Sequence, residues 1–222
     1  MLSSNILKWI ETIEPSHALI KGRAYLFTKR LMDISIILLA APFVIPVLLA
    51  ISFLIKLESP NGPIVYSQLR TGKGGNLFRL YKYRTMVPNA EKLKENYAHL
   101  NELKWPDFKI KNDPRVTKIG RFLRKTSLDE LPQLINILKG DMSFVGPRPT
   151  SFGTETYKVW HTERLDVVPG ITGIWQITAR AAVEFDDRLR LDILYLKKRC
   201  LLLDSLILFY TIPAVIRGNG AN

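Results

Sequence analysis

Two adjacent carboxylates, Asp129 and Glu130, lie in a part of the sequence that is rich in positive charge. Arg124 and Lys125 precede them, and Arg148 follows between two prolines that stiffen the backbone around it. An ionised aspartate can attack a phosphorus atom, provided that cations neutralise the phosphate oxygens that would otherwise repel it. This one stretch of the chain therefore supplies both components of a phosphoryl-transfer site.

The same stretch has the local pattern of a short amphipathic helix. Ser127 followed three residues later by Glu130 is a capping-box pattern, and Pro132 restricts the helix start to within a residue or two of Asp129. Gly140 is expected to end the helix. The helix dipole would favour the ionised forms of both acids. The alternative is that they only cap the helix, which is the commoner role of such a motif in isolation. Apolar residues recur at helical spacing, namely Leu128, Leu131, Ile135 and Leu138.

Residues 127–149 read S-L-D-E-L-P-Q-L-I-N-I-L-K-G-D-M-S-F-V-G-P-R-P. This run resembles the signature of the bacterial sugar transferases, which are small monotopic polyprenyl-phosphate phosphoglycosyl transferases. Further blocks extend the resemblance over Tyr25 to Gly220. It implies an enzyme that transfers a sugar-1-phosphate from a UDP-sugar to a membrane polyprenyl phosphate, undecaprenyl phosphate, and releases UMP. In the family, this reaction is the first membrane step of exopolysaccharide, capsule, O-antigen or glycoprotein glycan synthesis.

The resemblance implies roles for individual residues. Asp129 matches the nucleophile, which would hold the phosphosugar as a covalent aspartyl intermediate, and Glu130 matches its catalytic neighbour. Mg²⁺ is the expected cofactor, with Asp129, Glu130 and Asp192 as its ligands. Asp192 also interrupts an apolar helical stripe, where a carboxylate is costly to bury unless it faces a cation. The residues expected to contact substrate phosphates are Lys82, Arg124, Arg148 and Arg180.

The composition favours a membrane surface and phosphorylated partners. Apolar residues make up 47% of the 222 residues, and the formal net charge is +12. This combination suits anionic membrane lipids and phosphorylated substrates. Nucleic acid is the rival partner of a basic protein, but no recognised nucleic-acid motif is present, so no nucleic-acid partner is expected. Cys200 is the only cysteine, which excludes an internal disulfide.

One long apolar run covers residues 34–55 and has basic residues on both sides. Its length suffices for a transmembrane helix. Pro42 and Pro46 in its middle favour instead a helix that enters the membrane, breaks and returns, which would place both basic ends in the cytoplasm. The family that the sequence resembles has such a re-entrant helix, broken at a Ser-Pro pair. Here Pro46 matches the proline and Ile45 replaces the serine, so both topologies stay open, with the re-entrant one favoured.

The expected fold is α+β and predominantly helical, with a re-entrant membrane helix, a short β-hairpin and amphipathic interfacial helices around a compact cytoplasmic catalytic domain. Residues 1–28 would form an N-terminal surface or interfacial segment, residues 29–57 the re-entrant helix, and residues 58–222 the catalytic domain with its C-terminal interfacial helix. The N-terminal segment would carry a short helix that lies on the membrane or on a neighbouring chain.

Within the catalytic domain, strands are expected at 64–70 and 77–84, and the second carries Lys82. The expected helical segments are 89–105, a basic amphipathic element ending near Lys125, 185–199, and 201–216, the last lying in the membrane interface with Lys197, Lys198 and Arg199 on lipid phosphates.

These patterns place the protein on the cytoplasmic face of the bacterial inner membrane, as a monotopic enzyme. A homodimer and downstream glycosyltransferases are further candidate partners. A function of a different class stays open: a membrane-anchored basic scaffold that recruits polysaccharide-assembly proteins, in which the acidic pair is only a helix cap. The two functions differ in one measurable property, because a scaffold releases no nucleoside monophosphate.

Overall fold

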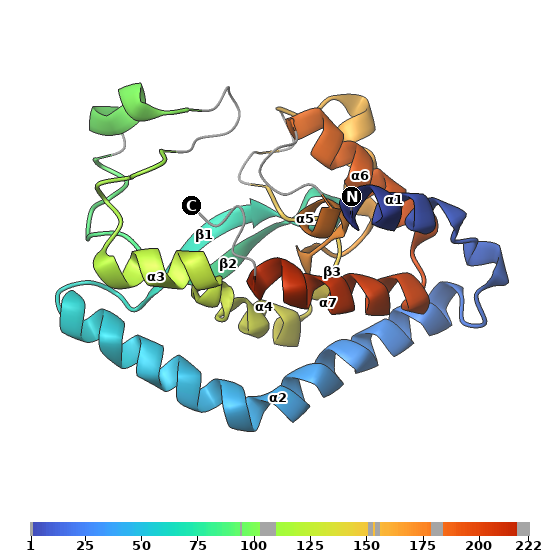
Figure 1. The fold of residues 1–222 in the computed structure, drawn as a ribbon, viewed down its shortest axis with the longest axis horizontal. Helices are drawn as coiled ribbons and strands as arrows, with labels where there is room; N and C mark the ends of the chain where they lie inside the picture. The colour runs from blue at the N-terminus through green and yellow to red at the C-terminus, as the bar shows by residue number, and fades with distance from the viewer. Residues whose placement is uncertain are drawn as a thin grey trace.

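Helices make up most of the computed structural model, which describes residues 2–93, 95–102, 110–150, 153, 156–178 and 184–216 (Figure 1). The strands form two separate two-stranded sheets, β1 (Val65–Thr71) with β2 (Leu77–Tyr83) and β3 (Ser143–Val145) with β4 (Gly170–Thr172). The predicted α+β class is confirmed. The helices are α1 (Leu2–Thr12), α2 (Gly22–Glu58), α3 (Lys118–Thr126), α4 (Gln133–Lys139), α5 (Ile174–Thr178), α6 (Phe185–Lys198) and α7 (Leu201–Ile216).

The longest element is α2, a helix of 37 residues that contains Pro42 and Pro46 and bends in its middle (Figure 1). Each proline lacks the N–H that would bond the carbonyl one turn earlier, and its ring pushes that carbonyl aside, so the helix bends here. Among the described residues, α2 is the one helix long and apolar enough to cross a membrane, and only 6% of its most apolar window is buried. It begins at Gly22 rather than at residue 29 as predicted.

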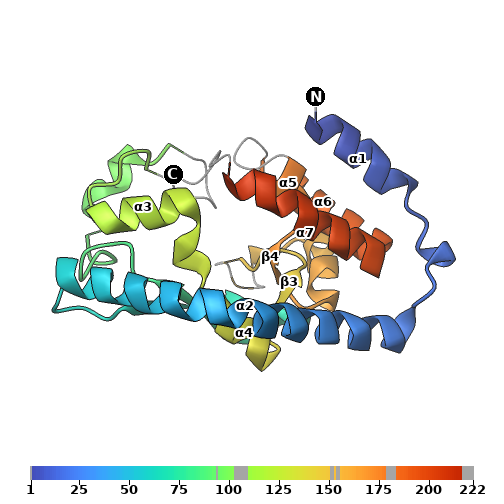
Figure 2. The same ribbon diagram turned by 60° about the horizontal axis from the view of Figure 1, so that its bottom comes forward.

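Both arms of α2 are bonded to the same folded unit. On the first arm, Arg30 donates hydrogen bonds to the carbonyls of Ile137 and Leu138 at the end of α4, the second at 2.8 Å. On the second arm, the Tyr83 hydroxyl of β2 donates to the carbonyl of Leu48 at 2.8 Å. In Figure 2, α2 extends across the width of the molecule, with α3 towards one end and α7 towards the other. Both arms of α2 therefore run from the bend back towards this folded unit (Figure 1).

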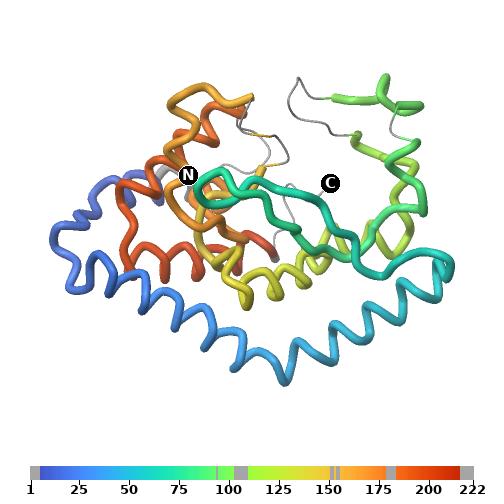
Figure 3. The backbone as a smooth tube through the Cα atoms, turned by 180° about the vertical axis from the view of Figure 1, so that it is seen from behind, coloured from blue at the N-terminus to red at the C-terminus, as the bar shows by residue number. Residues whose placement is uncertain are grey.

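The predicted hairpin is confirmed, with β1 and β2 antiparallel and Lys82 opposite Tyr66. Its open edge is bonded to α4 by Asn136, whose side chain is fully buried. The Asn136 amide donates to the carbonyl of Arg79 at 2.7 Å and accepts from the N–H of Tyr81 at 3.1 Å. These two bonds fix the position of Lys82, the next residue of β2. Figure 3 shows the hairpin from behind, crossing the middle of the molecule.

The short parallel sheet of β3 and β4 leads directly into the loop that carries Arg148. Gly146 and Gly170 allow the two chains to approach, because a Cβ atom on Gly170 would lie 2.1 Å from the nitrogen of Gly146. The strand β3 is also held by α2, since the Asp33 carboxylate accepts a hydrogen bond from the N–H of Phe144 at 3.2 Å. The helix α2 thus contributes to the position of the Arg148 loop.

The N-terminal helix α1 packs against the body of the domain. Ile10 and Ile13 are 1% and 8% exposed and join a core cluster with side chains of α5, α6 and α7. Lys198 of α6 donates to the carbonyls of Glu11 and Ile13 at 2.8 and 2.9 Å, where α1 ends. One face of α1 therefore packs on the protein itself, and the contact of its exposed face with a membrane or a neighbouring chain stays a prediction. Lys198 bonds protein carbonyls where lipid phosphates were expected.

The helix α7 has one buried and one exposed face. Leu203 and Ile207 are fully buried, whereas Phe209 and Ile212 are more than half exposed. Asp204 is also fully buried, and it is paired with Lys29 of α2 at 3.0 Å. It further accepts hydrogen bonds from two tyrosine hydroxyls, those of Tyr25 and Tyr195. The position of α7 in a membrane interface stays a prediction.

The helix predicted at residues 89–105 is wrong over the part that the structure describes. Asn89 has a left-handed backbone, with φ of 64°, and the chain after it makes successive turns. A short 3₁₀ helix follows at Glu95–Leu100, and residues 103–109 lie outside the described residues. Asparagine adopts this backbone readily, so a residue read as a helix cap makes a turn instead.

Candidate active site

The acidic pair lies in a 3₁₀ turn, Leu128–Glu130, between α3 and α4. Ser127 ends α3 with a left-handed backbone of φ 59°, and its side chain caps no helix. The predicted capping box is therefore wrong, and α4 begins only at Gln133. The Glu130 side chain that a capping box would use is engaged by two cations from other elements. The predicted end of the helix is confirmed, because Gly140 is its left-handed C-cap.

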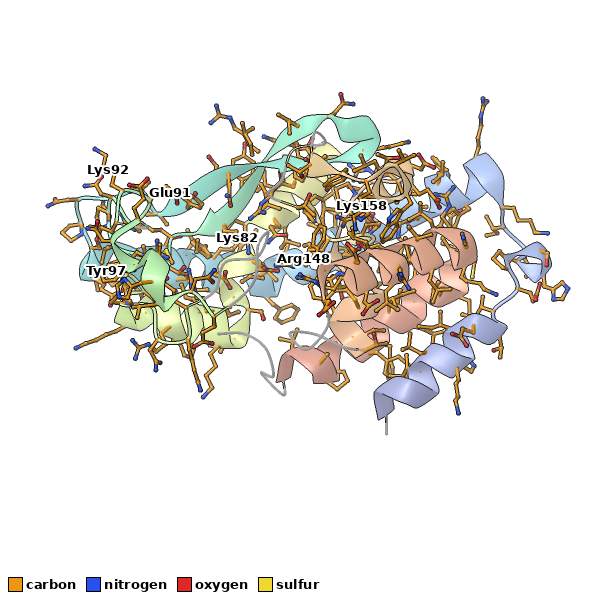
Figure 4. All side chains as sticks on the ribbon, turned by 90° about the horizontal axis from the view of Figure 1, so that it is seen from above. Lys82, Glu91, Lys92, Tyr97, Arg148 and Lys158 are labelled. Carbon is orange, nitrogen blue, oxygen red and sulfur yellow. The ribbon has the colours of Figure 1, made fainter. Side chains whose placement is uncertain are left out.

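Glu130 is held between a lysine of the hairpin and an arginine of the loop after β3. Its Oε1 accepts from Lys82 Nζ at 2.6 Å and from Arg148 Nη2, and its Oε2 accepts from Arg148 Nη1 at 3.2 Å. Lys82 Nζ also lies 4.0 Å from Asp129 Oδ2. Figure 4 shows Lys82 and Arg148 close together near the middle of the molecule. The structure therefore brings together four predicted site residues.

Arg124 approaches the pair from the end of α3. Its Nε donates to Thr85 Oγ1 at 2.9 Å, and among the described residues its two terminal nitrogens have no hydrogen-bond partner. Burial lowers the pKa of Arg124, and the charge of Asp129 opposes that shift. A partly buried guanidinium whose terminal N–H groups bond no described residue, beside an aspartate, is available to bind an anionic ligand.

The two adjacent acids have pKa values shifted in opposite directions. Burial raises the pKa of Asp129 and the charge of Glu130 adds to this, while Lys82 opposes it. Burial would also raise the pKa of Glu130, but Arg148 and Lys82 hold that pKa well below its usual range. The prediction that the dipole of the helix favours the ionised forms of both acids is therefore wrong in its cause, because α4 begins further on, at Gln133. For Asp129 it is also wrong in its direction, because desolvation of this partly buried carboxyl raises its pKa.

Sequence reasoning missed Arg70 of β1. Burial lowers the pKa of Arg70 to about 10, with a further contribution from the positive charge of Arg148, and Glu130 acts in the opposite direction. Its Nη2 donates to Gln68 Oε1 at 2.7 Å. No sequence motif marks this residue, since its proximity to the site follows only from the pairing of the hairpin.

Asp192 of α6 is 2% exposed and pairs with Arg164 Nη2 at 2.7 Å. The prediction that this carboxylate faces a cation is confirmed. Burial raises the pKa of Asp192 to about 6, and Arg164 opposes the shift. The other predicted phosphate-binding residue, Arg180, lies outside the described residues.

The three carboxylates expected to hold Mg²⁺ do not form a cluster. Glu130 is already paired with two cations, and Asp192 is paired with Arg164. In the described part of the chain, no three His, Cys, Asp or Glu side chains are gathered so as to hold a metal ion. Asp129, Glu130 and Asp192 as a set therefore do not fit a metal centre.

The flanks of the acidic turn connect the site to α2. Leu128 and Leu131, on either side of the pair, pack against a core cluster that includes Ile51 and Ile55 of α2. The turn that carries the acidic pair is thus packed against the second arm of the one described helix that is long and apolar enough to cross a membrane.

A family model described as bacterial sugar transferase matches residues 24–218. This chain belongs to the bacterial sugar transferase family. The match covers nearly the whole range of the resemblance read from the sequence. Lys82, Asp129, Glu130 and Arg148 all lie within the matched region.

Curated relatives of this bacterial sugar transferase carry related names. The undecaprenyl-phosphate galactose phosphotransferase of Salmonella typhimurium is 45% identical over 208 residues, which cover 90% of this chain and 42% of the relative. The galactosyl transferase CpsE of Streptococcus agalactiae is 40% identical, over 89% of this chain and 44% of the relative. The chain therefore spans less than half the length of these two. The exopolysaccharide production protein ExoY of Sinorhizobium fredii is 39% identical, over 87% of this chain and 88% of the relative.

Proposed function

We propose that this protein transfers a sugar-1-phosphate from a UDP-sugar to a membrane polyprenyl phosphate, undecaprenyl phosphate, through a covalent intermediate on Asp129. The observation that carries the proposal is the partly buried acidic pair with Lys82, Arg124 and Arg148 around it. The names of the relatives agree with it, since one is an undecaprenyl-phosphate galactose phosphotransferase. In a cell, such a reaction would begin the synthesis of an exopolysaccharide or another membrane-assembled glycan.

The reaction has two displacements at one phosphorus atom. In the first, a carboxylate oxygen of Asp129 attacks the phosphorus that bears the sugar, the bond to the bridging oxygen breaks, and UMP leaves with the electron pair. In the second, an oxygen of polyprenyl phosphate attacks the same phosphorus and the acyl phosphate bond breaks. This releases polyprenyl diphosphosugar and restores the Asp129 carboxylate. Two steps suit a site that receives a water-soluble donor and a lipid acceptor.

The opposite pKa shifts indicate different roles for the two acids in the proposed reaction. Glu130, whose pKa is held low, stays ionised and keeps Lys82 and Arg148 beside the reacting group. Asp129, whose pKa is raised by burial, is the more basic carboxylate of the pair and so the better nucleophile once ionised. The cations stabilise the charge that develops on the phosphoryl oxygens, and their positions are set before the substrate arrives.

We propose that Mg²⁺ binds together with the UDP-sugar donor, and not at a site made of the three carboxylates. A diphosphate binds Mg²⁺ with its own oxygens, and such an ion commonly keeps only one or two protein ligands. Asp129 is the carboxylate of the site without a hydrogen-bonded cation, its nearest being Lys82 at 4.0 Å. When bound, the ion would neutralise phosphate charge.

We further propose that α2 is re-entrant and that the protein is monotopic on the cytoplasmic face of the inner membrane. A helix that crosses a bilayer places its two ends on opposite sides. The contacts of Arg30 near one end and of Tyr83 with Leu48 in the other arm support a return to the same side, because both involve the same folded unit. The exposed apolar side chains near the bend, Leu39 and Phe43, would lie in lipid. The basic charge of the chain supports contacts with anionic lipids.

The test is incubation of the purified chain with a panel of UDP-sugars, polyprenyl phosphate and Mg²⁺, with UMP as the readout. At least one donor should give UMP, and Asp129→Asn should abolish its release while keeping the fold. Asp187→Asn, which changes a carboxylate that is more than half exposed on α6, is the matched control and should keep full activity. Turnover by Asp129→Asn would refute the nucleophile, and failure of every donor would favour the scaffold function.

A further inference from the structure

Arg164 is a buried cation that no step of the proposed reaction uses. It lies in a 3₁₀ helix, Val159–Asp166, and its side chain is 4% exposed. Its Nη2 contacts Asp192 Oδ2 at 2.7 Å and also donates a hydrogen bond to the main-chain carbonyl of Arg148. One guanidinium thus connects α6 to the loop that carries the arginine paired with Glu130.

Stability alone does not account for this pair. Removing two charges from water costs several kcal/mol for each ion, and a buried ion pair is often no more stabilising than apolar side chains of the same volume. Both members are almost inaccessible, at 4% and 2% exposure, so the desolvation cost applies in full. We therefore look for the role of this ion pair in the groups that it holds in place.

The loop around Arg148 has few other means of fixing its backbone. Arg148 lies between Pro147 and Pro149, and neither proline has an N–H to donate. The carbonyl of Pro147 accepts from Gly170, and that of Arg148 accepts from Arg164. Further along, the carbonyl of Thr150 accepts from the N–H of Thr71 on β1 at 3.3 Å. The Arg148 carbonyl itself, between these two backbone anchors, is therefore held by a side chain from another element.

We propose that Arg164, oriented by Asp192, is a positioning residue for Arg148. The Asp192 carboxylate pairs with Nη2 of Arg164, the same nitrogen donates to the Arg148 carbonyl, and the Arg148 side chain then reaches Glu130 and the carbonyl of Ile171. The inference rests on the proposed function, in which Arg148 neutralises the transferred phosphoryl group. It gives Asp192 a role through two arginines and without a metal ion.

The proposal predicts a particular kinetic effect. Because Arg148 acts on charge that develops during transfer, a displaced Arg148 lowers kcat more than it raises KM for the UDP-sugar. Small displacements of a catalytic group cost up to about 100-fold in rate. A pair that served only to hold the fold together would instead lower the thermal midpoint and the yield of folded protein.

The experiment replaces both buried charges with apolar side chains, as Arg164→Met with Asp192→Leu. This double variant removes both charges of the pair together, so neither is left buried without the other, and its thermal midpoint should stay close to that of the wild type while kcat for UMP release falls about 10- to 100-fold. Lys158→Met is the control, because it removes an exposed ion pair, Lys158–Asp186, between the same two parts of the chain, and it should leave kcat unchanged.

The deciding measurement is a mutant cycle with Arg148→Ala. If the pair acts through Arg148, adding the double change to Arg148→Ala causes no further loss of kcat. Losses that multiply, or a double variant with wild-type kcat, overturn the inference and leave the proposed function intact. Arg164→Lys covers the case in which the double variant fails to fold. It keeps a cation for Asp192, but its terminal nitrogen is one bond closer to the backbone than Nη2 of arginine, so it should not reach both Asp192 and the Arg148 carbonyl. It should keep the wild-type thermal midpoint with a reduced kcat, and an unchanged kcat would again overturn the inference. Absence of UMP release by the wild type would instead refute the proposed function itself.

Discussion

Replacing Arg148 with alanine removes the cation that the structure places most firmly at the acidic pair. Its guanidinium makes two hydrogen bonds to Glu130 and one, at 3.3 Å, to the carbonyl of Ile171. Loss of one preorganised donor to a developing oxyanion costs about 2.7–4 kcal/mol, or about 10²–10³-fold in kcat. Glu130 keeps Lys82 at 2.6 Å, so the stability cost should be below the 3–5 kcal/mol of a stranded buried charge.

The assay compares UMP release and thermal unfolding for the same preparations of wild type and Arg148→Ala. We expect kcat/KM to fall by about two to three orders of magnitude while the thermal midpoint changes little. Arg79→Ala is the matched control, because it removes an exposed arginine from β2, and it should keep full activity. The reasoning is refuted if Arg148→Ala retains wild-type kcat/KM, or if its loss of activity is explained by an equal loss of folded protein.

Three further changes test other parts of the structure. Glu130→Gln should move the acidic limb of the pH profile of kcat/KM to lower pH. Asp129 must be ionised to react, and the negative charge of Glu130 contributes to the raised pKa of Asp129. An acidic limb that stays in place or moves to higher pH would contradict this. Pro42→Ala with Pro46→Ala should straighten α2 and allow chemical labels to reach one of its ends from the outer face of sealed membranes, whereas the wild type is labelled at both ends from the inner face only. Asp204→Asn should lower the free energy of unfolding by about 3–5 kcal/mol, because Lys29 loses its buried partner, and an unchanged thermal midpoint would contradict that.

Local patterns predicted the elements whose stability comes from nearby residues. The hairpin follows from alternating side chains around a glycine-rich turn, and the bend of α2 follows from Pro42 and Pro46. Gly140 ended α4 as expected, because a left-handed C-cap needs only that residue. The need of Asp192 for a cation followed from the cost of burying a carboxylate, although the sequence could not identify that cation.

The remaining features depend on contacts between distant parts of the chain. Ser127 and Glu130 have the spacing of a capping box, but Glu130 gains three charge-assisted hydrogen bonds, one from Lys82 and two from Arg148, which outweigh a local cap. The buried face of α1 could not be inferred, because its partners belong to the last third of the chain. Arg164 lies in no recognisable motif, and only the folded chain brings it to the carbonyl of Arg148.

The intermediate on Asp129 is the most direct measure of the central claim. The purified chain is incubated with a UDP-sugar in the absence of polyprenyl phosphate, quenched, and examined by intact mass spectrometry. The account predicts a mass increase of one phosphosugar, located on Asp129 by peptide mapping, absent from Asp129→Asn and lost when polyprenyl phosphate is added. Turnover with no adduct on the wild type, or an adduct that persists in Asp129→Asn, would contradict it.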